Sequence, residues 1–412
     1  MVYGETMSIP SFVEQIRERA KRAINKLSEY GADIDISRYV REAEIGEIDL
    51  REEDIKKKLI QLGIDVEEDR IAGTYYQLDK YILSVYSKYP GIEILSIKEA
   101  LEKYRDWITD YFWKAVPVDR DKYTALAELY GEGGYVIIAK ENSRVPYPIQ
   151  ICMIIRSTGI IQAPHNIIIA RRGSSINIIT GCGIIKEAAS IHAGVTEFYI
   201  EKDATVNYVM IHGWSRYQHV RPRTGAIIDS KGKFVNHYIT FSPSKTLQTY
   251  PVIELVGDEA SAYMTSVVVG NRDEDIDIGS AIYLRGYGSK GEIVSRLLGK
   301  GKSRIINRVR IWGFAPKVRG HIECTGLLMS DTAEIHTIPE LKSNISNVSL
   351  THEASIGKIA EDEIIYLMSK GFTKEEAEGI LIRGFMKVRP YGIPKQLEQA
   401  IEQAIAIASR GM

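Results

Sequence analysis

The chain has 412 residues and a formal net charge of −1, with 53 lysines and arginines against 54 aspartates and glutamates. This balance argues against a nucleic-acid-binding surface that dominates the molecule. No apolar run approaches the ~20 residues that a membrane span needs, and three cysteines cannot form a disulfide framework. We expect a cytoplasmic protein of two or three domains with no membrane and no nucleic-acid partner.

Residues 1–118 are predicted to form an N-terminal helical domain. Apolar residues recur at helical spacing from Phe12 to Leu27, after a capping Ser11 and before Gly31. Further helices are predicted near Asp49–Leu62, Tyr75–Tyr89 and Ile97–Phe112. The charged runs between the apolar positions are expected to be solvated helix faces.

Residues 119–355 are predicted to be a β-rich core. The chain holds 34 glycines and many isoleucines, and short apolar runs alternate with turn residues. A loose repeat recurs in these turns, for example at 172–176, 202–206, 257–262 and 286–290. Such reiterated strands indicate a sandwich, a barrel or a β-solenoid. A solenoid needs caps over its open ends, and the flanking helical regions could provide them.

Residues 356–412 are predicted to return to helix as a C-terminal domain. One helix is expected to close at Gly371, and Thr373 begins a capping-box pattern for a second helix that stops at Gly384. The segment Lys395–Ser409 is typical of an amphipathic terminal helix.

The segment Lys300–Ser303 resembles the end of a phosphate-binding loop but lacks the rest of that motif. The motif requires a glycine five positions before Gly301, where this chain has Arg296. The residues that follow are typical of a strand and not of a phosphate-cradling helix. We therefore expect that this chain does not itself hydrolyse ATP.

The three cysteines have different surroundings, and none belongs to a C-x-x-C pair. Cys152 lies in an apolar run and is expected to be a buried packing residue. Cys182 is expected at a turn, and the sequence leaves its role open. Cys324 has polar neighbours and is the best candidate for a reactive thiol. Downstream, Glu353 is expected on one strand face and His352 on the other.

Several motifs occur here in the order typical of one family. They are the segments 122–126, 133–136, 181–182, 324–329, 336–339, 351–359, 361–372 and 382–385. With them the chain resembles the SufB/SufD iron–sulfur cluster assembly proteins over roughly residues 50–390. Within that family SufB proteins carry a cysteine at the position of Cys324 and a His-Glu pair where SufD proteins have His-Gly. The pair His352-Glu353 therefore resembles SufB.

The resemblance implies a right-handed parallel β-helix core flanked by helical domains. It implies a scaffold of the SUF system that accepts sulfur and iron and builds a transient iron–sulfur cluster, with Cys324, Glu353 and His352 as sulfur or metal sites. It also implies a SufC-type ABC ATPase docked on the C-terminal helices, and a homodimer or a SufD-like heterodimer. One thiol with a carboxylate or an imidazole suits a scaffold that must release its cluster.

One departure from the family pattern concerns sulfur entry. SufB proteins commonly have a second cysteine in a middle turn, where the matching position of this chain is near Ile228. Either sulfur reaches Cys324 directly, from a donor protein or as sulfide, or the chain has lost part of the activity.

Two alternatives stay open beside the scaffold. The first is a SufD-like structural subunit without catalytic residues. The second is a β-helix polysaccharide enzyme, which would need acidic or basic residues clustered along one groove, and no such recurrence is evident in the sequence.

Overall fold

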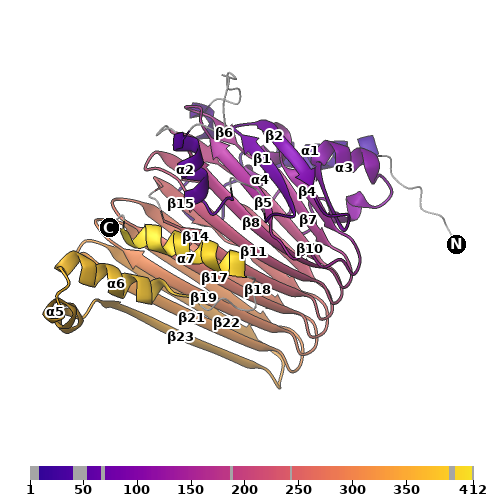
Figure 1. The fold of residues 1–412 in the computed structure, drawn as a ribbon. Coiled ribbons are helices and arrows are strands. Elements are labelled where there is room, and N and C mark those ends of the chain that lie inside the picture. Colours follow the sequence, from indigo (N-terminus) through magenta and orange to yellow (C-terminus); the bar gives the residue numbers. More distant parts are fainter. Residues whose placement is uncertain are drawn as a thin grey trace.

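A computed structural model describes residues 9–39, 53–65, 70–185, 189–241, 244–388 and 395–410. Within these residues the chain forms a β-solenoid of about eight turns, with helices at both ends of the sequence (Figure 1). The mainly β fold with flanking helices is therefore confirmed, and the solenoid is selected over the sandwich and the barrel.

Two sheets face each other across the solenoid interior. The first sheet has the order β2-β1-β5-β8-β11-β14-β17-β19-β21-β23, and all its neighbours are parallel except β1 and β2. Its strands are β1 (Gly73–Leu78), β2 (Tyr81–Ser87), β5 (Ile149–Ile155), β8 (Ser175–Ile184), β11 (Thr205–Gly213), β14 (Lys233–Thr240), β17 (Ser261–Gly270), β19 (Lys290–Gly299), β21 (Arg319–Leu328) and β23 (Ser349–Lys358).

The second sheet changes character along the solenoid. In the early turns it has two short strands per turn, and β15 and β16 then both pair with the long strand β18, which is followed by β20 and β22. Its strands are β3 (Ile92–Ser96), β4 (Tyr135–Ala139), β6 (Ile161–Gln162), β7 (His165–Ala170), β9 (Ser190–His192), β10 (Val195–Ile200), β12 (Gln218–Val220), β13 (Arg223–Ile228), β15 (Thr246–Thr249), β16 (Val252–Leu255), β18 (Asp275–Leu284), β20 (Arg304–Gly313) and β22 (Glu334–Ser343).

The loose repeat in the sequence is one corner of the solenoid. A residue with φ between 57° and 69° stands at this corner in successive turns: Gly173, Asp203, Lys231, Glu259, Gly288, Lys317 and Asn347. Each of the first six donates its backbone N–H to a carbonyl of the following turn, as Glu259 does to Tyr287 at 2.8 Å. The ladder of hydrogen bonds offsets the cost of the left-handed backbone at the non-glycine positions.

The N-terminal region is less helical than its sequence suggests. The predicted helix over Tyr75–Tyr89 is wrong, because these residues form the antiparallel hairpin of β1 and β2 around Asp79 and Lys80. Tyrosine, isoleucine and valine favour strands, and pairing of β1 with β5 overrides any local helical spacing. The helices of this region are α1 (Ile9–Ala23), α2 (Glu53–Gln61), α3 (Ile97–Lys103) and α4 (Lys122–Tyr130), with short 3-10 turns at Ile36–Arg38 and Ile108–Tyr111.

The boundaries of the other N-terminal helices also shift. The first helix begins at Ile9 and ends at Ala23, well before the predicted stop at Gly31. The predicted helix near Asp49–Leu62 is found as α2, while residues 49–52 lie outside the described residues. Ile97–Phe112 divides into α3, which Ser96 begins with a capping box, and a separate 3-10 turn.

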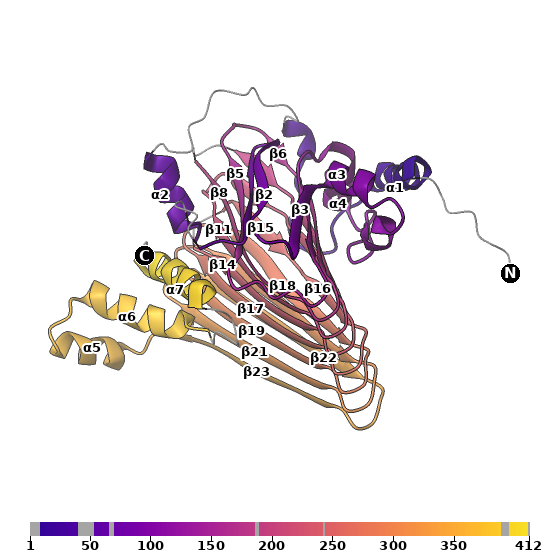
Figure 2. The same cartoon turned by 45° about the vertical axis from the view of Figure 1, so that its right-hand side comes forward.

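The C-terminal helices are confirmed, although α6 continues past the predicted stop at Gly384 to Met386. Their placement differs from the expected cap. They are α5 (Glu361–Ser369), α6 (Lys374–Met386) with the predicted Thr373 capping box, and α7 (Lys395–Arg410). Figure 2 shows α7 along the first sheet near α2, with α5 and α6 to one side. Buried apolar residues of α6 and α7 pack on the outer face of that sheet, so these helices cover a face and leave the last strands uncovered.

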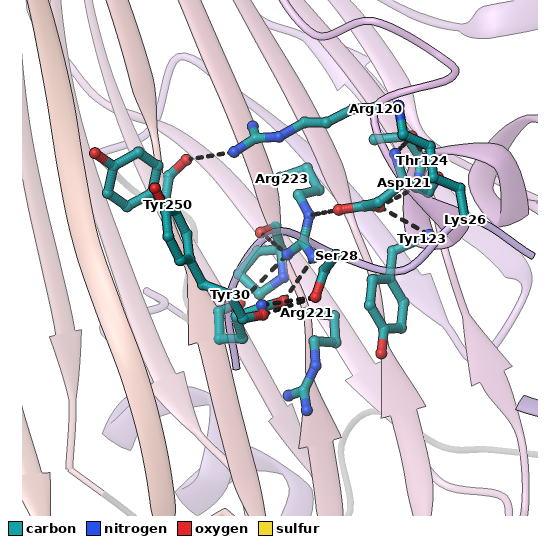
Figure 3. A network of polar contacts seen from close by, with 12 residues as sticks. Lys26, Ser28, Tyr30, Arg120, Asp121, Tyr123, Thr124, Arg221, Arg223 and Tyr250 are labelled. Carbon is teal, nitrogen blue, oxygen red and sulfur yellow. Dashed lines mark hydrogen bonds and ion pairs between the residues drawn. The ribbon is translucent and has the colours of Figure 1, made fainter. Parts of the chain in front are cut away.

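A buried polar network fixes the N-terminal segment to the second sheet (Figure 3). Asp121 caps α4 and accepts a hydrogen bond from the Arg223 Nε at 2.7 Å, and both side chains are almost fully buried. Arg221 donates to the Ala32 carbonyl, and Arg120 donates to the Tyr250 carbonyl. The N-terminal segment is therefore tied to the middle turns of the solenoid, near β13 and β16. Among the described residues, no helix has the length and apolarity that a membrane crossing requires.

Candidate functional site

Cys324 lies on the interior face of β21, one turn before the end of the solenoid. Side chains alternate across a strand, and the Cys324 residue is only 1% exposed. Asn307, on β20 of the opposite sheet, donates a hydrogen bond from Nδ2 to the Cys324 Sγ at 3.3 Å. Ser295 is the register partner of Cys324 on β19, and its Oγ lies 3.4 Å from the Asn307 Oδ1. We call Ser295, Asn307 and Cys324 the Cys324 cluster.

The protonation state of Cys324 follows from this environment. Burial raises the pKa of the thiol to about 11, and hydrogen bonds from Asn307 and Ser295 offset part of the rise. In the free chain the sulfur therefore carries its proton at neutral pH. Because the thiolate is the metal ligand and the nucleophile, a cation that binds this sulfur must displace the proton.

His352 and Glu353 lie on β23, the last strand of the first sheet. In the register of β21 and β23, Ile322 pairs with His352, Glu323 with Glu353, and Cys324 with Ala354. His352 therefore shares the strand face of Cys324, and Glu353 lies on the opposite face, as the alternation predicts. Both are exposed. Within a single chain, His352 therefore lies on the same strand face as Cys324, whereas Glu353 does not.

The last turn ends in two unpaired strand edges. β22 and β23 are terminal in their sheets, and nearly every residue of β23 is exposed. Ile338 on β22 and Ile356 on β23 leave 47% and 43% of their surfaces accessible. An exposed edge with apolar side chains is a template for pairing with another chain. The Cys324 cluster is thus one strand away from a surface that the described residues leave uncovered.

The other two cysteines lie in the earlier turns. Cys152 on β5 packs among apolar residues, which confirms its predicted burial. Cys182 is not at a turn as predicted, because it lies within β8 and points into the interior. There it meets His192 and His212, a grouping that the sequence reading missed. The sequence signal that could have revealed this grouping is the spacing of Cys182 and His212. They lie one solenoid turn apart and are register partners on β8 and β11.

Two other positions singled out in the sequence take structural roles. Lys300–Ser303 connects β19 and β20, and the strand that follows excludes the phosphate-binding loop. Ile228, near which the family resemblance places the second cysteine common in SufB proteins, is a fully buried core residue of β13.

A basic groove runs along the outer face of the first sheet. It measures about 690 Å³, and Lys233, Lys290 and Arg319 line it in one register column. The sequence showed no charged residues clustered along one groove, and this expectation was wrong. The solenoid repeat brings together basic residues that lie far apart in the sequence. Glu292 is the one carboxylate among the lining residues. The described residues that line this groove therefore lack the paired carboxylates of a glycoside hydrolase.

Comparison with known proteins gives a consistent result. Residues 153–385 match the family model described as SUF system FeS cluster assembly, SufBD core domain. The chain is 38% identical over 405 residues to an iron–sulfur cluster assembly SufBD family protein of Methanothermobacter thermautotrophicus (strain Delta H). This alignment covers 96% of the chain and 98% of the relative. It is 40% identical over 357 residues to such a protein of Archaeoglobus fulgidus, covering 87% and 96% of the two chains.

Proposed function

The chain belongs to the SufBD family of iron–sulfur cluster assembly proteins, and from this premise we propose that it is a SufB-like scaffold subunit of the SUF system. In this role it accepts sulfur and iron and assembles a cluster that it later releases. The cluster is cargo, and the chain itself is not an enzyme.

The observation that carries the proposal is the position of Cys324. Its thiol lies inside the solenoid, with Asn307 as hydrogen-bond donor, next to the uncovered last strand. We propose that Cys324 receives the sulfur and that His352, on the same strand face, binds iron beside it. Glu353 is the third proposed ligand. It lies on the other face of an exposed edge strand, so it would reach the cluster only when β23 is repositioned by a partner.

The proposed partners correspond to two uncovered surfaces. A second chain of the same family, a copy or a SufD-like subunit, is proposed to pair with the edges of β22 and β23. A SufC-type ATPase is proposed to bind the C-terminal helices, where Ile365, Tyr366 and Met368 of α5 expose between 45% and 61% of their surfaces. Solvent-facing apolar side chains clustered on one helix support a protein-binding role.

Sulfur delivery is proposed to occur directly at Cys324. Since Ile228 supplies no thiol in the middle turns, a persulfide relay through that position is unavailable. A donor persulfide would transfer its outer sulfur to the Cys324 thiolate and leave as a thiolate, whereas free sulfide would enter as a ligand of iron without bonding to the Cys324 sulfur. Either would approach from the open end, where the last turn alone separates Cys324 from solvent.

Anaerobic reconstitution with ferrous iron and sulfide, in the presence of the partner ATPase, tests the proposal. We expect visible cluster absorbance in the unaltered protein and in Cys152→Ser, and at least tenfold less in Cys324→Ser. His352→Ala and Glu353→Ala should weaken the signal without abolishing binding of the ATPase. The scaffold role is wrong if no absorbance develops, or if Cys324→Ser behaves like the unaltered protein.

The position of Glu353 also favours a second candidate, a SufD-like structural subunit. If the ligands never come together, the chain stabilises the complex without holding a cluster. This candidate predicts that ATPase binding survives the combined Cys324→Ser, His352→Ala and Glu353→Ala substitutions, and that the unaltered chain forms no cluster even with its partner.

A further inference from the structure

Three metal-ligating side chains meet inside the early turns of the solenoid, far from Cys324. Cys182, His192 and His212 each place one ligand atom within 4.8 Å of the others, and all three residues are buried. We call them the Cys182 cluster. Cys182 and His212 are register partners on β8 and β11, and His192 comes from β9 of the second sheet. The cluster therefore joins both sheets at one corner.

A neighbouring glutamine orients His192. Gln162 donates from Nε2 to the carbonyls of Asp79 and Ile154 at 2.8 and 3.1 Å, so its Oε1 faces the His192 Nδ1 at 2.9 Å. An amide oxygen only accepts, and the His192 Nδ1 must therefore carry the proton. The lone pair is left on Nε2. A histidine held in this way, donating from one ring nitrogen to an oxygen, has the arrangement typical of metal ligands.

His212 presents a ring nitrogen that the described residues leave unsatisfied. Its Nδ1 lies 3.0 Å from the Tyr238 hydroxyl, whereas its Nε2 has no hydrogen-bond partner although the residue is fully buried. Buried polar atoms are almost always paired, so an orphaned one requires an explanation. A metal ion bound to Nε2 would supply the missing partner.

We propose that Cys182, His192 and His212 bind a single divalent transition-metal ion of the zinc or iron type. One thiolate and two imidazoles suit these ions, whereas magnesium and calcium prefer oxygen ligands. Binding replaces the thiol proton with a sulfur–metal bond and releases that proton to solvent, with no change of oxidation state. Three protein ligands leave a fourth position open for a small molecule or water.

This ion would be distinct from the cluster assembled at Cys324. Five strand steps, through β11, β14, β17, β19 and β21, separate β8 from β21. At about 4.8 Å per step they amount to roughly 24 Å, far beyond ligand distance. The inference therefore goes beyond the proposed function: it assigns a resident ion to the covered half of the molecule.

Titration of the metal-free full-length protein with Co²⁺ under anaerobic conditions tests the site. We expect one equivalent to bind in the unaltered protein, with a thiolate-to-cobalt charge-transfer band and the visible bands of a four-coordinate ion. Cys152→Ser and Cys324→Ser should keep the band. Cys182→Ser should lose it, and His212→Gln should bind at least tenfold more weakly. Competition of Zn²⁺ and Fe²⁺ against bound Co²⁺ distinguishes the two ions.

Thermal unfolding provides a second readout, and its measurement on the unaltered protein needs no folded variant. Zn²⁺ should raise the melting temperature of the unaltered protein but not that of Cys182→Ser. The proposal is overturned if the unaltered protein shows neither a charge-transfer band nor a metal-dependent melting shift. It is also overturned if Cys182→Ser keeps the full band, or if Cys324→Ser loses it. If Cys182→Ser does not fold, His212→Gln and the unaltered protein still decide.

Discussion

The first and last turns of the solenoid end in opposite ways. At the first turn, β2 and β3 pair antiparallel with β1 and β4. In the middle turns, the buried network of Asp121, Arg221 and Arg223 fixes the N-terminal segment to the second sheet near β13 (Figure 3). At the last turn, β22 and β23 end in open edges with exposed Ile338 and Ile356. The first turn therefore ends in antiparallel strands, of which β2 exposes Ile82 and Leu83, whereas the last turn ends in two parallel strand edges that can pair with a partner.

The thiols divide in the same way. Burial raises the pKa of Cys152 and Cys182 in the early turns, and no hydrogen-bond donor among the described residues offsets this rise. Cys324 lies one turn from the open end, and Asn307 and Ser295 moderate its rise. We infer that the early turns, which hold Cys152 and Cys182, serve stability and the binding of a resident metal ion. The last turns, which hold Cys324, serve the uptake and release of the iron–sulfur cluster.

Substitution of Asp121 should produce the largest effect and tests how firmly the N-terminal segment is held on the second sheet. Asp121→Ala leaves Arg223 charged and buried without its carboxylate, and it removes the cap of α4. We expect a loss of about 3–5 kcal/mol in the free energy of unfolding, measured by urea denaturation. As a control, Glu254→Ala in the more exposed pair with Arg285 should cost less than about 1 kcal/mol. Equal losses would contradict the difference between a buried and a surface pair.

A charge at the open edge should act on association instead of folding. Ile356→Lys places an ammonium group at the open edge of the solenoid interior, on the strand face of β23 that Cys324 occupies in β21, where we expect a partner chain to pair. Partner affinity should fall about 30-fold, or about 2 kcal/mol, while single-chain stability changes by less than about 0.5 kcal/mol. Light scattering coupled to size-exclusion chromatography measures the association. Val256→Lys, a substitution of an equally exposed residue in a turn, should leave it unchanged.

Local signals in the sequence predicted much of this architecture. The Thr373 capping box and the turn repeat were found where the pattern placed them, because a cap and a left-handed corner are determined by a few adjacent residues. The hairpin of β1 and β2 was missed because pairing with β5, across some seventy intervening residues, decides its conformation. Local spacing carries no information about such a partner.

The candidate site was predictable only in part, for the same reason. The alternation of His352 and Glu353 follows from strand geometry and was foreseen. The Cys182 cluster and the basic groove of Lys233, Lys290 and Arg319 were not, because they depend on the register between turns. A known repeat length would have aligned these positions, whereas the irregular turns concealed it in a single sequence.

The order of thiol alkylation sharpens the comparison between the two halves. Iodoacetamide should modify Cys324 first, since local opening of the last turn exposes it while Cys152 and Cys182 stay enclosed. Because the Cys324 pKa is about 11, the thiolate fraction and the rate should rise about tenfold per pH unit between pH 7 and 10. Peptide mass spectrometry at several pH values follows each site. Faster labelling of Cys152 or Cys182 would contradict the proposed accessibility.

The capping boxes of α4 and α6 allow a direct comparison between the N-terminal segment on the solenoid and the C-terminal helices. Thr373 caps α6 as Asp121 caps α4. The exposed Thr373 hydroxyl accepts from the Glu376 backbone N–H, whereas the buried Asp121 carboxylate also accepts from Arg223. Thr373→Ala should therefore cost only about 0.5–1 kcal/mol, and Thr373→Ser, which keeps the acceptor, should cost less. Amide exchange in the first turn of α6 should accelerate several-fold while the exchange of β11 and β14 is unchanged. A loss as large as that of Asp121→Ala would mean that the C-terminal helices unfold together with the solenoid, and the two regions would then be one cooperative unit.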